Sequence, residues 1–84
     1  MNSKHRKTLA AVFRVPVSGT IEWAAIEGLL IAAGAQVIEG AGSRVRFEKD
    51  GHVETFHRPH PAKEAKRYQV RAAREFLERI GVTP

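Results

Sequence analysis

The stretch RVRFEKDGHVETFH, from Arg44 to His57, constrains the fold of this 84-residue chain more than any other segment. Apolar and polar residues alternate on both sides of Asp50-Gly51, and an Asp-Gly pair in that setting is a strong signal of a two-residue β-turn. Such a turn places Arg44 opposite His57 at the open end of the two strands. The segment therefore predicts a β-hairpin whose register is fixed by its turn.

The two faces of this hairpin differ in chemistry, because successive side chains of a strand point to opposite faces. One face carries apolar side chains and belongs against a hydrophobic core. The other carries donors that suit a phosphate, beside a histidine, a residue type that titrates near neutral pH. The apolar face holds Val45, Phe47 and Phe56, and the polar face holds Arg44, Arg46, Thr55 and His57.

Helical periodicity appears twice before the hairpin. Residues 3–15 carry Leu9, Val12 and Phe13 on one face among basic residues, and the pattern stops before Pro16. This predicts a short basic helix, followed by a connector that runs to residue 19.

A second helix is expected between a capping Thr20 and a terminating Gly34, with Glu22 in the first turn complementing the helix dipole. Residues 36–39 then form a short strand, and the GAGS turn at residues 40–43 leads into the hairpin. The sheet is thus expected to have three antiparallel strands. The apolar stripe of the second helix contains Trp23, Ile26, Leu29, Leu30 and Ala33.

A polar connector over residues 59–66 leads to a last helix that ends at Gly81. Two apolar helix faces can cover one face of the sheet and leave the other free. The stripe of the last helix contains Val70, Ala73, Leu77 and Ile80, and its solvent side offers the i,i+4 pairs Arg71 with Glu75, Arg74 with Glu78, and Glu75 with Arg79.

The composition limits the class of protein. Residues 1–84 suffice for a single domain. The absence of cysteine excludes disulfides and thiolate metal sites, and it fits a reducing compartment. The apolar run from Leu9 to Phe13 is too short for a signal sequence, and no segment approaches the roughly 20 apolar residues of a membrane span. We expect a soluble cytoplasmic protein that has no membrane partner.

The charge of the chain favours a polyanionic partner. Fourteen Lys and Arg against nine Asp and Glu give a formal net charge of +5 at pH 7. A basic balance on so small a surface attracts RNA or DNA first. The alternative is a charge kept only for solubility.

Two histidines lie where the hairpin ends, in FHRPHP at residues 56–61. Their spacing is a poor match to a metal site, and Ser43 lacks the G-x-S-x-G context of a serine hydrolase. Cleavage of RNA requires fewer catalytic groups from the protein, because RNA supplies its own 2′-hydroxyl nucleophile. A histidine can then act as the base, and arginines can supply the cations. The alternative is structural, with His57 and His60 closing the strand and capping the connector.

The segment from Leu29 to Val82 resembles the HicA toxins in the order of its features. These are a helix ending in Gly, a short strand, a Gly-Ser before the second strand, a hairpin, a Pro/His strand exit, a Lys-Glu connector and a final helix. The resemblance implies an α+β fold with a double-stranded-RNA-binding-domain-like α-β-β-β-α core over residues 20–84, preceded by an extra helix and connector over residues 1–19. It also implies mRNA interferase activity and a HicB-like antitoxin that covers the toxin. We expect no cofactor.

The resemblance fails at one position. In HicA toxins the usual active-site histidine directly follows Gly-Ser, whereas Arg44 follows Gly42-Ser43 here. Either His57 replaces that histidine, with His60 at the family's strand-exit position as a second catalytic candidate, or the protein binds RNA or its antitoxin without cutting. A third reading is a module whose first and last helices serve only a protein partner. The candidate RNA contacts are Ser43, Arg44, Arg46, Arg58 and Lys63.

Overall fold

The computed structural model describes all 84 residues, and its six elements occur in the predicted order. The three strands form one antiparallel sheet in the order β1-β2-β3. This confirms the expected α+β arrangement, which is like that of a double-stranded-RNA-binding domain with an extra N-terminal helix. The elements are α1 (Ser3–Val12), α2 (Trp23–Ala32), β1 (Gln36–Glu39), β2 (Arg44–Lys49), β3 (His52–His57) and α3 (Arg67–Arg79).

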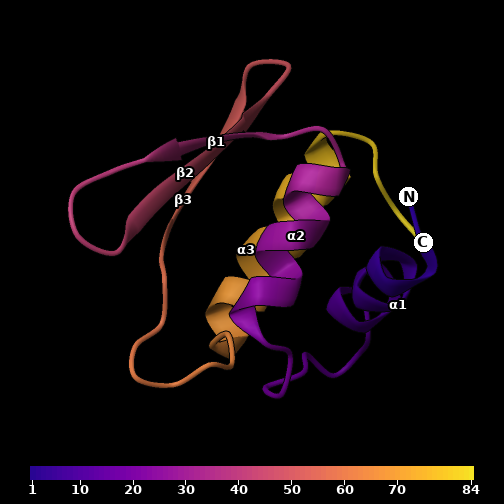
Figure 1. Ribbon diagram of the computed structural model, residues 1–84. Coiled ribbons are helices and arrows are strands. Elements are labelled where there is room, and N and C mark those ends of the chain that lie inside the picture. The colour runs from indigo at the N-terminus through magenta and orange to yellow at the C-terminus, as the bar shows by residue number, and fades with distance from the viewer.

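The elements lie in three layers (Figure 1). The sheet is on one side, α2 and α3 lie side by side against it, and α1 packs on the far side of the two helices. One face of the sheet is therefore covered and the other is open, as the two apolar helix stripes predict. None of the helices is long and apolar enough to cross a membrane.

The register of the hairpin agrees with the prediction at every pair from Lys49 and His52 out to Arg44 and His57. The turn requires a left-handed backbone at both central residues, with φ of 52° at Asp50 and 81° at Gly51. Aspartate tolerates that conformation and glycine adopts it freely, so the two residues fix the turn and with it the register.

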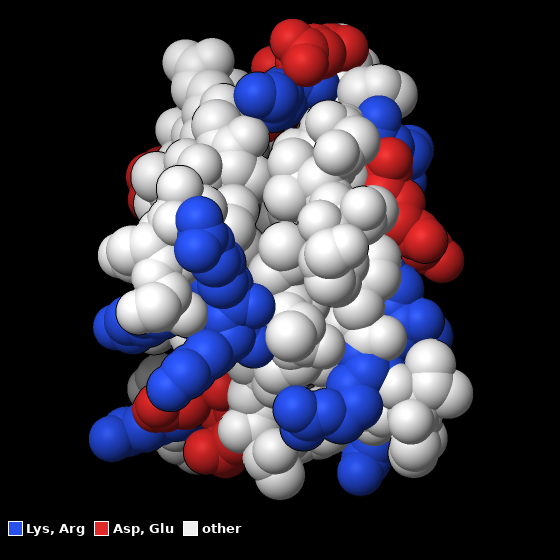
Figure 2. All heavy atoms as spheres, turned by 90° about the vertical axis from the view of Figure 1, so that its right-hand side faces the viewer, with Lys and Arg blue, Asp and Glu red and all other residues white.

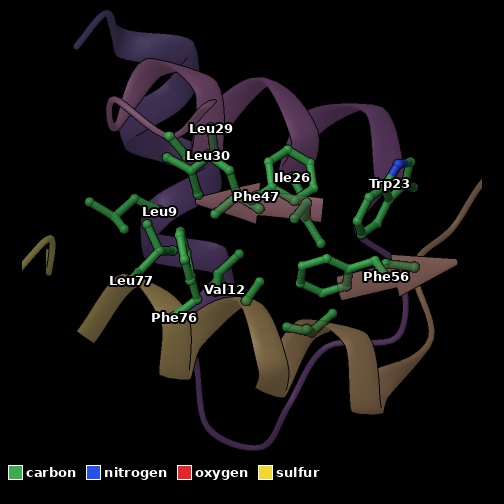
Figure 3. Close-up of a cluster of buried hydrophobic side chains, with 14 of the residues drawn as sticks. Leu9, Val12, Trp23, Ile26, Leu29, Leu30, Phe47, Phe56, Phe76 and Leu77 are labelled. Atoms are coloured by element: carbon green, nitrogen blue, oxygen red, sulfur yellow. The ribbon is translucent and has the colours of Figure 1, made fainter. Parts of the chain in front are cut away.

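A single cluster of buried apolar side chains joins all three layers (Figure 3). Its aromatic centre lies where α2 meets the sheet. There Trp23 packs against Phe56 with ring centroids 5.0 Å apart, and Phe47 meets Phe56 edge-on at 5.8 Å. Leu9 and Val12 bring α1 into the same cluster, so the extra helix is part of the core.

The first helix is shorter than predicted. It ends at Val12, and the chain leaves the helix through Phe13 instead of continuing to Val15. At the other end, the side chain of Asn2 accepts a hydrogen bond from the His5 N–H at 2.9 Å, which caps the helix. Pro16 disfavours helical backbone only in Val15, the residue before it, so it does not account for the earlier end at Val12.

The prediction that Thr20 caps the second helix is wrong. The Thr20 side chain instead lies 3.1 Å from the Ser18 hydroxyl, and the N-cap position belongs to Glu22, which makes no side-chain cap. The backbone before the helix is held by a remote segment, because the N–H of Trp23 donates to the Lys63 carbonyl and the N–H of Ala65 donates to the Ile21 carbonyl, both at 2.8 Å. This pairing sets the start of α2.

The i,i+4 ion pairs predicted on the last helix are also wrong. Arg74 donates to the carbonyls of Val12 and Arg14, and Arg79 pairs with Glu54 at 3.2 Å. These arginines reach neighbouring elements, so they bond across the fold and not along their own helix. The buried stripe itself is confirmed, since Val70, Ala73 and Leu77 lie in the core with Ile80 at its edge.

Candidate functional site

The free face of the sheet holds an open depression of about 530 Å³ near the end where β2 begins and β3 ends. It joins Arg44, Arg46, Thr55 and His57, the four residues that the hairpin pattern assigns to this face. Arg44 and His57 are direct cross-strand partners, so a cation and an imidazole lie side by side at one end of the depression. The rest of its lining is Ile38, Glu39 and Gly40.

Ser43 lies beside this end of the depression. The pairing of the strands continues one step past Arg44, because the N–H of Arg58 donates to the Ser43 carbonyl at 2.9 Å. The Ser43 hydroxyl is then 3.5 Å from Nδ1 of His57, a long contact. The turn that delivers Ser43 depends on Gly42, whose φ of 60° lies in the left-handed region.

The strand end that carries His57 is fixed from behind by Gln69 of α3. The Gln69 amide is almost fully buried, with 2% of the residue exposed. Its Nε2 donates to the His57 carbonyl at 2.7 Å, and its Oε1 accepts from the N–H of Lys66 at 3.0 Å. A buried amide with both groups satisfied holds the backbone of His57 in place.

Arg46 faces the open side of the depression. Its Nε lies 2.8 Å from a carboxylate oxygen of Glu48 on the same strand, and 48% of its side chain is exposed. An exposed pair of this kind contributes little to stability, and no hydrogen bond or ion pair within the fold uses the two Nη groups of Arg46. Arg46 can therefore still contact a phosphate.

Arg58 is held by two carboxylates. Its guanidinium donates to both oxygens of Glu27, at 2.9 and 3.0 Å, and to both oxygens of Glu39, at 2.7 and 2.9 Å. These hydrogen bonds, to Glu39 first and then to Glu27, raise the pKa of Arg58, and they lower the pKa of each glutamate from its ordinary value near 4.5. Four of the five N–H donors of an arginine are thus used within the fold.

The other two sequence candidates lie apart from the depression. His60 is exposed on the connector after β3 and lines no part of it. Lys63 lines a different hollow beside Trp23, at the start of α2, where its carbonyl receives the Trp23 N–H. The structure therefore brings Ser43, Arg44, Arg46 and His57 together and leaves Arg58, His60 and Lys63 outside.

Sequence reasoning missed Glu27, Glu39 and Gln69. The two glutamates are separated from Arg58 by 31 and 19 residues, so no local pattern joins them. The position of Gln69 in the sequence gave a weak indication that its side chain is buried. A polar residue beside the apolar stripe of a helix can be buried, and a buried polar side chain makes hydrogen bonds.

The donor set of the depression suits an anion. No group of three or more His, Asp or Glu side chains comes together anywhere in the chain to bind a metal ion. Arginine guanidinium groups and a histidine on a free sheet face, above a double-stranded-RNA-binding-domain-like fold, define a small protein with a basic candidate site for a nucleic-acid phosphate.

A comparison with known families agrees with this class. The family model described as the HicA toxin of bacterial toxin-antitoxin systems matches residues 23–82. The chain therefore belongs to the HicA toxin family, whose members pair with HicB antitoxins and are generally mRNA interferases. Comparisons with curated proteins and with solved structures gave no significant match. The match includes the depression and leaves α1 outside.

Proposed function

We propose that this protein is a toxin that cleaves mRNA by acid–base catalysis, with His57 as the group that moves the proton. The observation that carries the proposal is the cross-strand pair of Arg44 and His57 at the end of the depression. It supplies a proton acceptor beside a cation on a surface that is open to an RNA strand.

The chemistry needs few groups, because the nucleophile belongs to the substrate. His57 accepts the proton of a 2′-hydroxyl, the 2′-oxygen bonds to the adjacent phosphorus, and the bond from phosphorus to the 5′-oxygen breaks. Arg44 and Arg46 stabilise the negative charge that develops on the phosphoryl oxygens. The leaving 5′-oxygen takes a proton from solvent or from a second acid, for which His60 is the candidate. The products carry a 2′,3′-cyclic phosphate and a 5′-hydroxyl.

The experiment compares His57→Ala with His60→Ala. Both remove an exposed imidazole, three residues apart, but only His57 lines the depression. General-base catalysis contributes about 10² to 10⁴ in rate, so His57→Ala should lower cleavage of a single-stranded RNA by that factor. His60→Ala should lower cleavage less than His57→Ala does, because His60 lies outside the depression and solvent can also protonate the leaving oxygen. Circular dichroism checks that both variants fold.

Two results would remove the proposal. One is full cleavage activity in His57→Ala. The other is intact RNA after incubation with the unmodified protein at good soluble yield, with transcripts and growth unchanged when the chain is expressed alone.

The second candidate function is RNA binding without cleavage. It is favoured by Arg44, which occupies the position directly after Gly42-Ser43 where the family usually carries its active-site histidine. In this case the depression holds phosphate through Arg44 and Arg46. The protein then binds RNA in a salt-dependent way, and no variant of His57 changes the length of the RNA.

A HicB-like antitoxin is the proposed protein partner. In this proposal the antitoxin covers the depression and so blocks RNA access to His57 and Arg44. Coexpression with the protein encoded by the neighbouring reading frame should restore growth and yield a complex that no longer binds RNA.

A further inference from the structure

Most of the net charge of this protein lies outside the region that matches the family. Residues 1–19 contain four Lys and Arg and no acidic residue, whereas residues 20–84 contain ten Lys and Arg against nine Asp and Glu. Four of the five net positive charges therefore belong to α1 and its connector. The domain that carries the depression is close to neutral.

These four cations form an exposed surface, which we name the α1 basic surface: Lys4, Arg6, Lys7 and Arg14. The opposite side of α1 is buried through Thr8, Leu9 and Val12. None of the four is in an ion pair, because all salt bridges of the protein involve Arg46, Arg58 or Arg79. Their charge is not neutralised within the fold.

The placement of these charges is unfavourable for the helix itself. The first turn of α1 has no acidic residue, and Lys4 lies in it. The N-terminus of a helix carries a partial positive charge, so a cation in the first turn is destabilising. Charge kept only for solubility could lie anywhere on the surface without this cost, which favours a role for cations at this place.

The α1 basic surface lies on the other side of the molecule from the depression. The sheet and α1 flank the α2 and α3 layer from opposite sides (Figure 1). On the face that includes α1, Lys and Arg groups lie across the middle and lower parts, and Asp and Glu groups lie mainly at the margins (Figure 2). The helix is firmly held there, since Arg74 donates to the Val12 and Arg14 carbonyls.

The chemistry of this surface fits a phosphate backbone better than a protein. Between Lys4 and Arg14 the only other exposed residue is Ala10, and the large apolar residues exposed next to this span are Met1 and Val15, one at each end. Four cations thus outnumber the apolar side chains that could anchor a partner protein. Unpaired cations on an open surface bind nucleic acid chiefly through its phosphates, independently of sequence.

We propose that the α1 basic surface is a second RNA-binding surface, which holds the sugar–phosphate backbone of an RNA strand remote from the segment in the depression. This inference rests on the proposed RNA substrate. The two surfaces together select RNA that is long enough to pass around the domain.

The test compares two double variants that remove equal charge. Lys4→Gln/Lys7→Gln alters the α1 basic surface, and Lys49→Gln/Lys66→Gln removes two lysines that lie neither there nor in the depression. The probe is a fluorescein-labelled, unstructured 30-nucleotide RNA with 2′-O-methyl groups, which has no nucleophile and stays intact. Fluorescence anisotropy over a salt series gives the slope of log affinity against log salt.

The slope should become shallower by about 1.4 in Lys4→Gln/Lys7→Gln, since each phosphate contact with a single strand contributes about 0.7. It should change by less than half of that in the control pair. Equal changes in both pairs, or an unchanged slope in the α1 variant, would overturn the inference. So would an unchanged slope combined with weaker antitoxin binding, which would make α1 a protein-docking helix.

These outcomes separate the inference from the proposed function. An unmodified protein that binds no RNA refutes both. A protein that cleaves RNA through His57 but has an unchanged slope in Lys4→Gln/Lys7→Gln refutes only the role of α1.

Discussion

Replacing Arg58 by methionine removes the charge that joins the end of β3 to α2 and β1, while it keeps most of the aliphatic bulk of the side chain. The change leaves Glu27 with a single hydrogen-bond donor, the indole N–H of Trp23 at 2.8 Å. The variant therefore loses two charge-assisted hydrogen bonds to a carboxylate that is only partly exposed.

The magnitude follows from the exposure of the pair. The side chains of Arg58 and Glu27 are 30% and 23% exposed, so the pair lies between the surface and the interior. Exposed pairs contribute about 0 to 1 kcal/mol and a broken buried pair costs about 3 to 5 kcal/mol, so we expect the loss of the Glu27 contact to cost about 1 to 2 kcal/mol. For a domain of this size that lowers the melting temperature by about 4 to 16 °C.

The assay is thermal and urea unfolding followed by circular dichroism, with Arg71→Met as the matched control. Arg71 is exposed on α3 and makes no hydrogen bond or ion pair in the structure, so its replacement should change the stability by less than about 0.5 kcal/mol. A double-mutant cycle with Glu27→Gln isolates the pair, since glutamine still accepts from Trp23. Equal stability losses for Arg58→Met and Arg71→Met, or no coupling in the cycle, would refute the reasoning.

Two further predictions concern pH and the hairpin turn. The folded pKa values of Glu27 and Glu39 are lowered, chiefly by hydrogen bonds from Arg58, so their contribution to stability is present above the ordinary value near 4.5 and is lost as the pH falls through the lowered values. Urea unfolding at several pH values should show a smaller acid-induced loss in Arg58→Met than in the unmodified protein, and an equal loss would contradict the assignment. Gly51→Ala should cost about 1 to 2 kcal/mol, because φ at Gly51 is 81° and the added methyl group meets no atom within 4 Å, so the cost is purely conformational. It should lower the urea midpoint without changing the slope of the transition, and an unchanged midpoint would show that the turn does not require glycine.

The candidate site was predictable as far as it depends on the hairpin. Asp50-Gly51 sets the turn, the turn sets the register, and the register decides that Arg44 and His57 are partners on the polar face. Each step involves residues that are close in the sequence, so local backbone preferences and side-chain alternation suffice.

The roles of the arginines were less predictable. The sequence assigns Arg58 to RNA because it is basic and lies between two candidate histidines, whereas its guanidinium is bound by carboxylates from α2 and the end of β1. Arg74 and Arg79 were expected to pair along their own helix and instead bond to α1 and β3. An arginine side chain is long enough to reach several elements, so its partner depends on which elements the fold brings near it.

The sequence by itself determined the elements, the hairpin register and the separation of a polar sheet face from an apolar one, because these follow from short-range geometry and from the period of the apolar residues. The tertiary structure alone decided the start of α2, which depends on pairing with Lys63 and Ala65. It also decided which cations remain unpaired, since carboxylates far away in the sequence neutralise Arg58 while none reaches Lys4 or Lys7. Charge can be counted in a sequence, but its partners are set by packing.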